Sequence, residues 1–319
     1  MSQSFKDRAK SAFLGLALGD AYGRPLEFVH GPDVRTDHVH IAPGHFQWTD
    51  DTHMAIYLAK AILDLEPRAI SADKFGHSVA KRFVEWSHDP LTPSTAPGGT
   101  CLQGARNYEE TGQWDKSGVF GSDGCGAVMR ICPLPLAFRG PALIEAAAIS
   151  ANVTHRHPNA AAAAIAASQI LREILETGIL DAGVIEKAIR VLAIHADRRE
   201  CVTDALRAAL EMSKSRELWL DERAIPEGSG GWRSASALGL AIAASLRWDG
   251  SFEKVVDRAA RIDGDSDSVA CLAGMFAGAA HGLEALPKRW LEVLPQREEI
   301  ESLAERLVDR PTVKTMLTA

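Results

Sequence analysis

The chain has 319 residues, of which 46% are hydrophobic, and its 35 Lys and Arg against 42 Asp and Glu give a formal charge of −7. That length and apolar content suffice for a large core, and the acidic balance argues against an extensive nucleic-acid surface or a polybasic membrane surface. Residues 1–10 lack the apolar core of a signal peptide, and no stretch resembles a membrane span. We therefore expect a cytoplasmic protein.

Hydrophobic residues recur with helical spacing through most of the chain, whereas the alternation typical of strands is scarce. The Ala-rich run over residues 160–167 predicts a buried helix that neighbouring helices can approach closely. Glycines and prolines mark helix ends near residues 178, 226–231 and 249–250. Further helices are predicted within His53 to Leu65, Phe75 to Trp86, Val184 to Leu192 and Ile300 to Leu307. Because no long linker divides them, we predict one compact, orthogonal, all-α domain over residues 1–319, with about a dozen helices.

Loops rich in glycine and proline connect these helices, and a helical scaffold places its chemistry on such connections. Two of them carry a dense set of small residues, at Gly98-Gly99-Thr100 and Gly124-Cys125-Gly126. Glycine lets backbone amides approach a ligand, and amides at helix N-termini favour phosphate or pyrophosphate, although such loops more often serve turns. For Cys125 we favour backbone approach to a phosphate over a role as nucleophile, because no oriented histidine partner is evident.

Two acidic clusters lie more than two hundred residues apart, Thr49-Asp50-Asp51-Thr52 and Asp263-Gly-Asp265-Ser-Asp267-Ser268. One such residue could simply cap a helix, but each cluster holds more carboxylates than a cap needs. Close carboxylates repel one another unless a cation lies among them, and hard divalent cations prefer oxygen ligands. Neither cluster supplies a full ligand shell, so we expect the fold to bring the two together around divalent metal.

Six motifs in the same order resemble the ADP-ribosylglycohydrolase family. They are Gly15-Leu-Ala-Leu-Gly-Asp20-Ala-Tyr-Gly23 with Glu27-Phe28, Trp48-Thr-Asp-Asp-Thr52, Pro97-Gly-Gly-Thr100, Gly124-Cys-Gly-Ala-Val-Met-Arg130, Thr154-His-Arg-His-Pro158, and Gly264-Asp-Ser-Asp-Ser-Val-Ala270 with Ala273-Gly274. The resemblance implies an all-α fold with two Mg²⁺ or Mn²⁺ ions in a loop-lined cleft. The ligands it implies are Thr49, Asp50, Asp51, Asp265, Asp267 and Ser268, with Asp263 beside them.

The reaction that the resemblance implies is hydrolysis of the glycosidic bond between ADP-ribose and an acceptor. Glu27 and Asp50 are the two candidates for activating the attacking water, and we expect them to share that role. The first acceptor expected is an arginine side chain of a modified protein, although Ala96 stands where arginine-type members carry an aspartate. Serine, polymer, O-acetyl and nucleobase conjugates stay open, as do a two-metal nucleotide phosphoesterase and a non-catalytic ADP-ribose-binding relative.

Three aromatic or histidine side chains complete the candidate set. His155 and His157 form a His-x-His pair, which we assign to lining the ligand site, with helix capping as the alternative. Trp232 follows a glycine turn and could stack on adenine, although packing is the favoured interpretation. The partner expected is an ADP-ribosylated protein or a small ADP-ribose conjugate, bound by a monomer.

Overall fold

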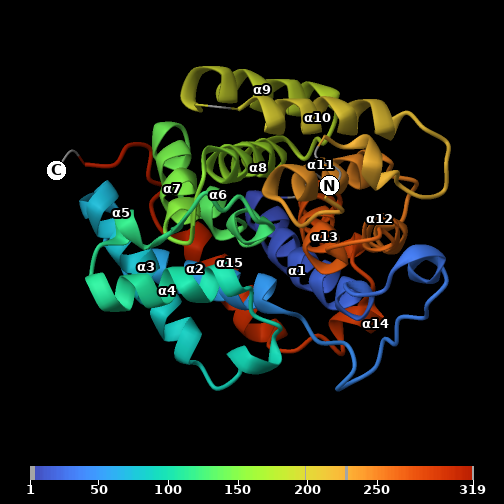
Figure 1. Ribbon diagram of the computed structural model, residues 1–319, viewed down its shortest axis with the longest axis horizontal. Coiled ribbons are helices and arrows are strands. Elements are labelled where there is room, and N and C mark those ends of the chain that lie inside the picture. The colour runs from blue at the N-terminus through green and yellow to red at the C-terminus, as the bar shows by residue number, and fades with distance from the viewer. Residues whose placement is uncertain (1–3, 198, 227–228, 318–319) are drawn as a thin grey trace.

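The computed structural model describes residues 4–197, 199–226 and 229–317, so Gly228, expected in a helix-ending turn, lies outside these ranges. The described residues form fifteen α-helices and one pair of very short strands (Figure 1). The α-helices are α1 (Phe5–Gly23), α2 (Asp50–Leu63), α3 (Ala72–His88), α4 (Gly99–Thr111), α5 (Trp114–Ser117), α6 (Pro133–Ala137), α7 (Pro141–Asn152), α8 (Pro158–Thr177), α9 (Ala182–His195), α10 (Glu200–Ser213), α11 (Ser234–Leu246), α12 (Phe252–Ala260), α13 (Ser266–His281), α14 (Lys288–Leu291) and α15 (Arg297–Asp309).

Short 3₁₀ turns and the two strands occupy the connections. The strands β1 (Val119–Phe120) and β2 (His155–Arg156) pair in parallel, with Val119 opposite His155. Two residues are too few for a periodic signal, so the sequence did not predict them. The 3₁₀ helices are η1 (Arg24–Leu26), η2 (Gly31–Arg35), η3 (Pro67–Ala69), η4 (Thr92–Ser94), η5 (Cys125–Ala127), η6 (Glu222–Ala224) and η7 (Leu283–Ala285).

The all-α prediction is confirmed, and each helix predicted from periodicity is present. The face of Phe75, Val79, Phe83 and Trp86 is fully buried in α3. The Ala-rich run lies inside α8. Helix α2 begins at Asp50, three residues earlier than predicted, because the acidic residues are themselves its first turn. Within the described ranges, no helix combines the length and apolarity that a membrane crossing requires.

Helices α1 and α13 lie side by side at the centre of the molecule, although they come from opposite ends of the chain (Figure 1). Glycines make their close approach possible. A Cβ added at Gly15 would lie 2.3 Å from the carbonyl oxygen of Gly274, and one added at Gly19 would lie 2.0 Å from that of Ala270. Both distances are far below van der Waals contact. This glycine seam therefore fixes the position of the first turn of α13, which carries the second acidic cluster.

Candidate functional site

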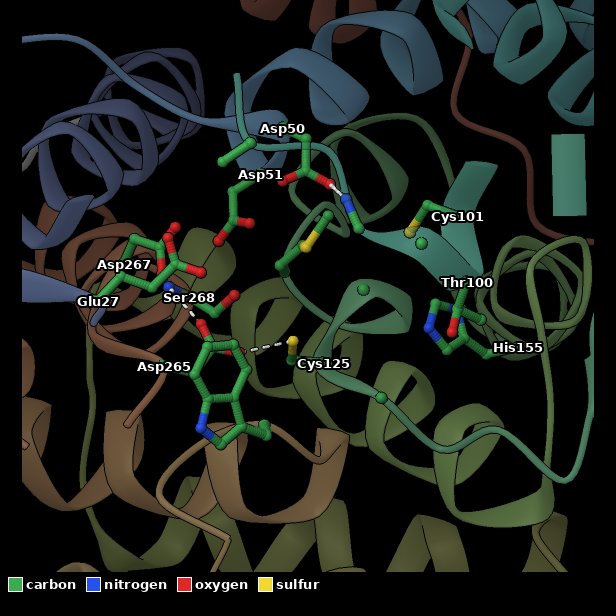
Figure 2. Close-up of a pocket in the computed structure, with 17 residues that line it drawn as sticks. Glu27, Asp50, Asp51, Thr100, Cys101, Cys125, His155, Asp265, Asp267 and Ser268 are labelled. Atoms are coloured by element: carbon green, nitrogen blue, oxygen red, sulfur yellow. Dashed lines mark hydrogen bonds between the residues drawn. The ribbon is translucent and has the colours of Figure 1, made fainter. Parts of the chain in front are cut away.

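A cavity of about 270 Å³ opens where the first turns of α2 and α13 meet the glycine-rich loops. Figure 2 shows the labelled carboxylates of both acidic clusters facing this space. The two clusters, distant in sequence, are therefore neighbours in the fold. The cavity is lined by Glu27, Asp50, Asp51, Ala96, Gly98, Gly99, Thr100, Cys101, Gly124, Cys125, Gly126, Met129, His155, Trp232, Asp265, Asp267 and Ser268.

The first cluster is the N-terminus of α2. Thr49 is the N-cap, and its hydroxyl accepts from the amide of Asp51 at 3.3 Å. Asp20, a buried carboxylate on α1, accepts hydrogen bonds from the first turn of α2. It accepts from the Thr49 amide at 2.8 Å, from the Thr52 amide at 2.9 Å and from the Thr52 hydroxyl at 2.6 Å. Thr49 is buried behind the cavity wall, while Asp50 and Asp51 line the cavity itself.

The second cluster is the N-terminus of α13. Asp265 is its N-cap and accepts from the Ser268 amide at 3.3 Å. The thiol of Cys125 donates to the other Asp265 oxygen at 2.7 Å. The glycine turn supports this arrangement, because the Asp265 amide donates to the Gly230 carbonyl at 2.8 Å and Gly230 has a φ of +58°. The turn before α11, which supports Asp265, therefore has a backbone that few residues other than glycine adopt.

The buried carboxylates lack compensating cations among the residues that line the cavity, none of which is Lys or Arg. Burial, and then the charge of Asp267, raises the pKa of both Asp51 and Asp265 well above the usual range. Among the described residues, Oδ2 of Asp51 and Oδ1 of Asp267 have no hydrogen-bond partner. Buried, unpartnered carboxylate oxygens that repel one another suit a divalent cation.

These oxygens fit the divalent-metal site that the sequence predicts. Four carboxylates come from two helix N-termini, with the hydroxyls of Thr49 and Ser268 beside them. In the described part of the chain, however, no three His, Cys, Asp or Glu side chains already stand as ligands of one ion. The donor set agrees with hard cations such as Mg²⁺ or Mn²⁺, and metal binding stays a proposal.

Glu27, one of the two candidate bases, follows η1 and reaches the cavity from the acidic side (Figure 2). Burial, and then the charges of Asp267, Asp50 and Asp20, raises its pKa to about 8. Asp50, the other candidate, accepts from the Gly98 amide at 3.0 Å, and burial raises its pKa to about 8 as well. Both groups therefore exchange protons near neutral pH when no cation is bound.

The glycine loops form another wall of the cavity. Gly99 and Thr100 are the first residues of α4, so free amides of a 13-residue helix face this region. Ala96 just before them has a φ of +52°, an uncommon conformation for alanine. A Cβ added at Gly126 would lie 2.7 Å from both Cys101 Sγ and His155 Cε1, so this position requires glycine.

The two histidines of the His-x-His pair separate. His155 is buried in the cavity wall, where burial and then the Arg130 charge lower its pKa to about 3, leaving the ring neutral. His157 lies in a different cavity and caps α8 by accepting from the Asn159 amide at 3.1 Å. Residues two apart in a regular strand point to the same side, but β2 ends at Arg156 and His157 already caps α8. The capping alternative thus describes His157, which does not line the acidic cavity.

Asp263 also points away from the acidic cavity. It is exposed, and it accepts from the Gly31 amide at 3.0 Å and contacts the His30 ring at 2.8 Å. It therefore tethers the segment after Glu27 to the turn before α13.

Two buried charges were missed by the sequence interpretation. Asp20 organises the start of α2, as described above. Arg130 is fully buried and donates to the carbonyls of Gly126 and Ser150 and to the hydroxyl of Thr154. It thereby joins the Gly124 loop to β2. The signal available in the sequence was a charged residue within an otherwise small and apolar helix or loop, which requires a buried partner.

Comparisons with known proteins agree with this geometry. A family model described as ADP-ribosylglycohydrolase matches residues 1–315. An ADP-ribosylarginine hydrolase, Tri1, of Pseudomonas putida is 28% identical over 95% of this chain and 78% of its own length. An ADP-ribosyl-[dinitrogen reductase] glycohydrolase of Rhodospirillum rubrum is 28% identical over 93% of this chain and 94% of its own.

The fold is shared with a solved structure as well. A chain of an ADP-ribosylglycohydrolase-related protein complex superposes with a TM-score of 0.73 at 28% identity, covering 96% of this chain and 98% of that one. The resemblance seen in the six motifs is thus confirmed along nearly the whole sequence. The chain belongs to the ADP-ribosylglycohydrolase family and is a hydrolase of that family.

Proposed function

We propose that this chain uses a pair of divalent cations, Mg²⁺ or Mn²⁺, to hydrolyse the glycosidic bond between ADP-ribose and an acceptor. The observation that carries the proposal is the convergence of two helix N-termini on one buried cavity, with unpartnered oxygens on Asp51 and Asp267. The proposed metal ligands are Thr49, Asp50, Asp51, Asp265, Asp267 and Ser268. When bound, such cations would anchor the two hydroxyls of the distal ribose and stabilise developing charge.

The protein itself orients the substrate along the cavity. The amides of Gly99 and Thr100 and the backbone of Gly124 and Gly126 form one wall of the cavity, and Thr100 lies at the end away from Glu27 (Figure 2). Backbone amides at a helix N-terminus suit the pyrophosphate. The neutral ring of His155 closes that wall without placing a charge there. The distal ribose would then lie over the acidic end, with its anomeric carbon toward Glu27.

The proposed chemical step is attack of water on the anomeric carbon. The Glu27 carboxylate takes a proton from that water at an Oε atom as the water oxygen bonds to the anomeric carbon and the bond to the acceptor breaks. Glu27 then returns this proton to the departing acceptor. Asp50, which the Gly98 amide orients at 3.0 Å, is the alternative base.

Arginine is the proposed acceptor, carried by a modified protein or present as a small conjugate. The support is the name of the Pseudomonas putida relative, an ADP-ribosylarginine hydrolase. Serine, polymer, nucleobase and O-acetyl conjugates are the alternatives. The residues that contact the acceptor determine which of these conjugates is hydrolysed.

Product analysis tests the proposal. Purified protein is incubated with ADP-ribosylarginine, ADP-ribosylserine and O-acetyl-ADP-ribose in Mg²⁺, Mn²⁺ or chelator, and the products are separated by chromatography. Intact ADP-ribose that forms only with metal supports the proposal. AMP as the product would instead identify a phosphoesterase, and turnover that persists in chelator would remove the metal from the reaction.

A further inference from the structure

Two exposed aromatic side chains, of which Trp232 lines the acidic cavity and Phe28 follows the cavity residue Glu27, stack on each other. Phe28 is 68% exposed and Trp232 is 41% exposed, and both belong to the few large hydrophobic side chains so exposed in the described part of the chain. Their rings lie 5.9 Å apart at an interplanar angle of 26°, which is a stacked arrangement. Exposing two large rings costs free energy that burial would recover, and such pairs on a surface commonly mark a contact site.

The pair stands at the acidic end of the cavity. Phe28 is the neighbour of the candidate base Glu27, and Trp232 itself lines the cavity. Trp232 follows Gly231, where an added Cβ would lie 3.2 Å from the Cβ of Asp265. In Figure 2, Glu27, Asp265 and Asp267 group at one end, whereas Thr100 and His155 lie at the other. The aromatic pair therefore lies beside the candidate base and the second acidic cluster. Trp232 also borders the Gly124 loop, because the Cys125 amide donates to the Trp232 carbonyl at 3.1 Å.

Charge favours a cationic group beside these rings. The cavity is lined by five carboxylates and by no Lys or Arg. Two of the five are near the pair, since Glu27 precedes Phe28 and Asp265 lies beside the glycine that precedes Trp232. The face of an aromatic ring attracts a guanidinium within about 6 Å of its centroid, and planar guanidinium groups stack on Trp and Phe. A flat cation on the rings would also complement these nearby carboxylates.

We infer that Phe28 and Trp232 form an aromatic platform that selects a planar cationic acceptor, the guanidinium of an ADP-ribosylated arginine. This inference rests on the proposed glycosidic hydrolysis and adds the residues that read the acceptor. The platform stabilises the leaving side chain on its stacked rings and leaves the ADP-ribose half to the rest of the cavity. A neutral acceptor, such as the acetyl group of O-acetyl-ADP-ribose, gains nothing from it.

The test compares two substrates that share ADP-ribose and differ only in the acceptor. kcat/KM is measured for ADP-ribosylarginine and for O-acetyl-ADP-ribose with wild-type protein and with Trp232→Leu, Phe28→Leu and Trp232→Phe. Trp248→Leu is the matched control, because Trp248 also stacks on another ring, that of His281 at 3.5 Å, and does not line the cavity. Affinity for free ADP-ribose is measured by calorimetry on the same proteins, and melting curves check that each variant is folded.

The platform predicts that either leucine variant lowers kcat/KM for the arginine conjugate about 5- to 30-fold relative to the O-acetyl conjugate. Trp232→Phe restores most of this selectivity, and free ADP-ribose binds with unchanged affinity. Equal losses on both substrates would overturn the inference. So would weaker binding of free ADP-ribose, which identifies a stack for adenine instead. Wild-type protein that hydrolyses only the neutral conjugate contradicts the platform alone, whereas protein that releases ADP-ribose from no conjugate contradicts the proposed function. Should Trp232→Leu fail to fold, the more exposed Phe28→Leu carries the test.

Discussion

Removing the carboxylate of Asp20 should lower the stability of the protein and disorder the start of α2, although Asp20 itself lies outside the acidic cavity. Asp20 does not line the cavity, yet it accepts three buried hydrogen bonds from Thr49 and Thr52, which flank Asp50 and Asp51. In Asp20→Ala all three donors lose their acceptor. At ~1–3 kcal/mol for each buried donor left unsatisfied, unfolding becomes easier by roughly 3 kcal/mol or more. At ~2 °C per kcal/mol, the melting temperature falls by about 6 °C or more.

Asp20→Asn should have a milder effect. An asparagine oxygen can keep the bonds from Thr52, while its amide group faces the Thr49 amide and loses one bond, at a cost of about 1.5–3 kcal/mol. Part of that loss is offset, because burial and then the charge of Asp267 raise the pKa of Asp20 to about 7 and removing the charge relieves this repulsion. We expect the order of stability wild type, Asn variant, Ala variant.

The assay is thermal unfolding with chelator and with millimolar Mn²⁺, followed by hydrolysis rates. In wild type Mn²⁺ raises the melting temperature, since it binds only the folded state, and in Asp20→Ala this rise should shrink because Asp50 and Asp51 are no longer held in place. Asp181→Ala is the control. Asp181 likewise accepts a helix-capping amide, from Val184 at 3.0 Å, but in α9 and outside the cavity. The Asp181→Ala variant should lose ~1 kcal/mol of unfolding free energy, and Mn²⁺ should raise its melting temperature as much as in wild type. An Asp20→Ala protein with wild-type melting and metal response would refute the reasoning.

Three further predictions separate binding, chemistry and packing. Asp265→Asn should weaken Mn²⁺ affinity and turnover together, whereas Glu27→Gln should bind Mn²⁺ almost normally and lose roughly 10²–10⁴-fold in single-turnover rate; full turnover by Glu27→Gln would shift the role of base to Asp50. Gly19→Ala should lower stability by about 1–3 kcal/mol in chemical denaturation, because its Cβ would lie 2.0 Å from the Ala270 carbonyl oxygen. An unchanged midpoint would show that α1 and α13 can move apart at the glycine seam without cost. Carboxylates with raised pKa values stabilise the metal-free protein at low pH and lose that contribution as pH rises through the folded values, about 8 for Asp50 and for Glu27. Mn²⁺ should therefore raise the melting temperature more at pH 8 than at pH 6, and equal shifts would contradict the carboxylate site.

Helical periodicity predicted the fold class because most helices bury one face, as α3 does with Phe75, Val79 and Phe83. Charge density alone indicated that the two acidic clusters meet, since neither Asp50 with Asp51 nor Asp265 with Asp267 can compensate its own charge. Their meeting in one cavity agrees with that expectation.

Other features depend on three-dimensional contacts that have no local sequence signal. The role of Asp20 follows from the approach of α1 to the start of α2, and the role of Arg130 from its bonds to Gly126 and Thr154. His157 was assigned to the ligand site by its spacing from His155, but spacing of two residues determines sidedness only within a regular strand, and the chain enters α8 at that point. The Phe28 and Trp232 pair joins segments two hundred residues apart, so only the fold reveals it.

The proposed function depends most on the two acidic clusters forming a single divalent-cation site. Crystals of the metal-free protein soaked in Mn²⁺ and measured at a wavelength where manganese scatters anomalously would test this most directly. We predict two anomalous peaks inside the cavity, with ligands drawn from both Asp50 or Asp51 and Asp265 or Asp267. Peaks that contact only one cluster, or a cavity without anomalous signal at saturating Mn²⁺, would contradict a shared site.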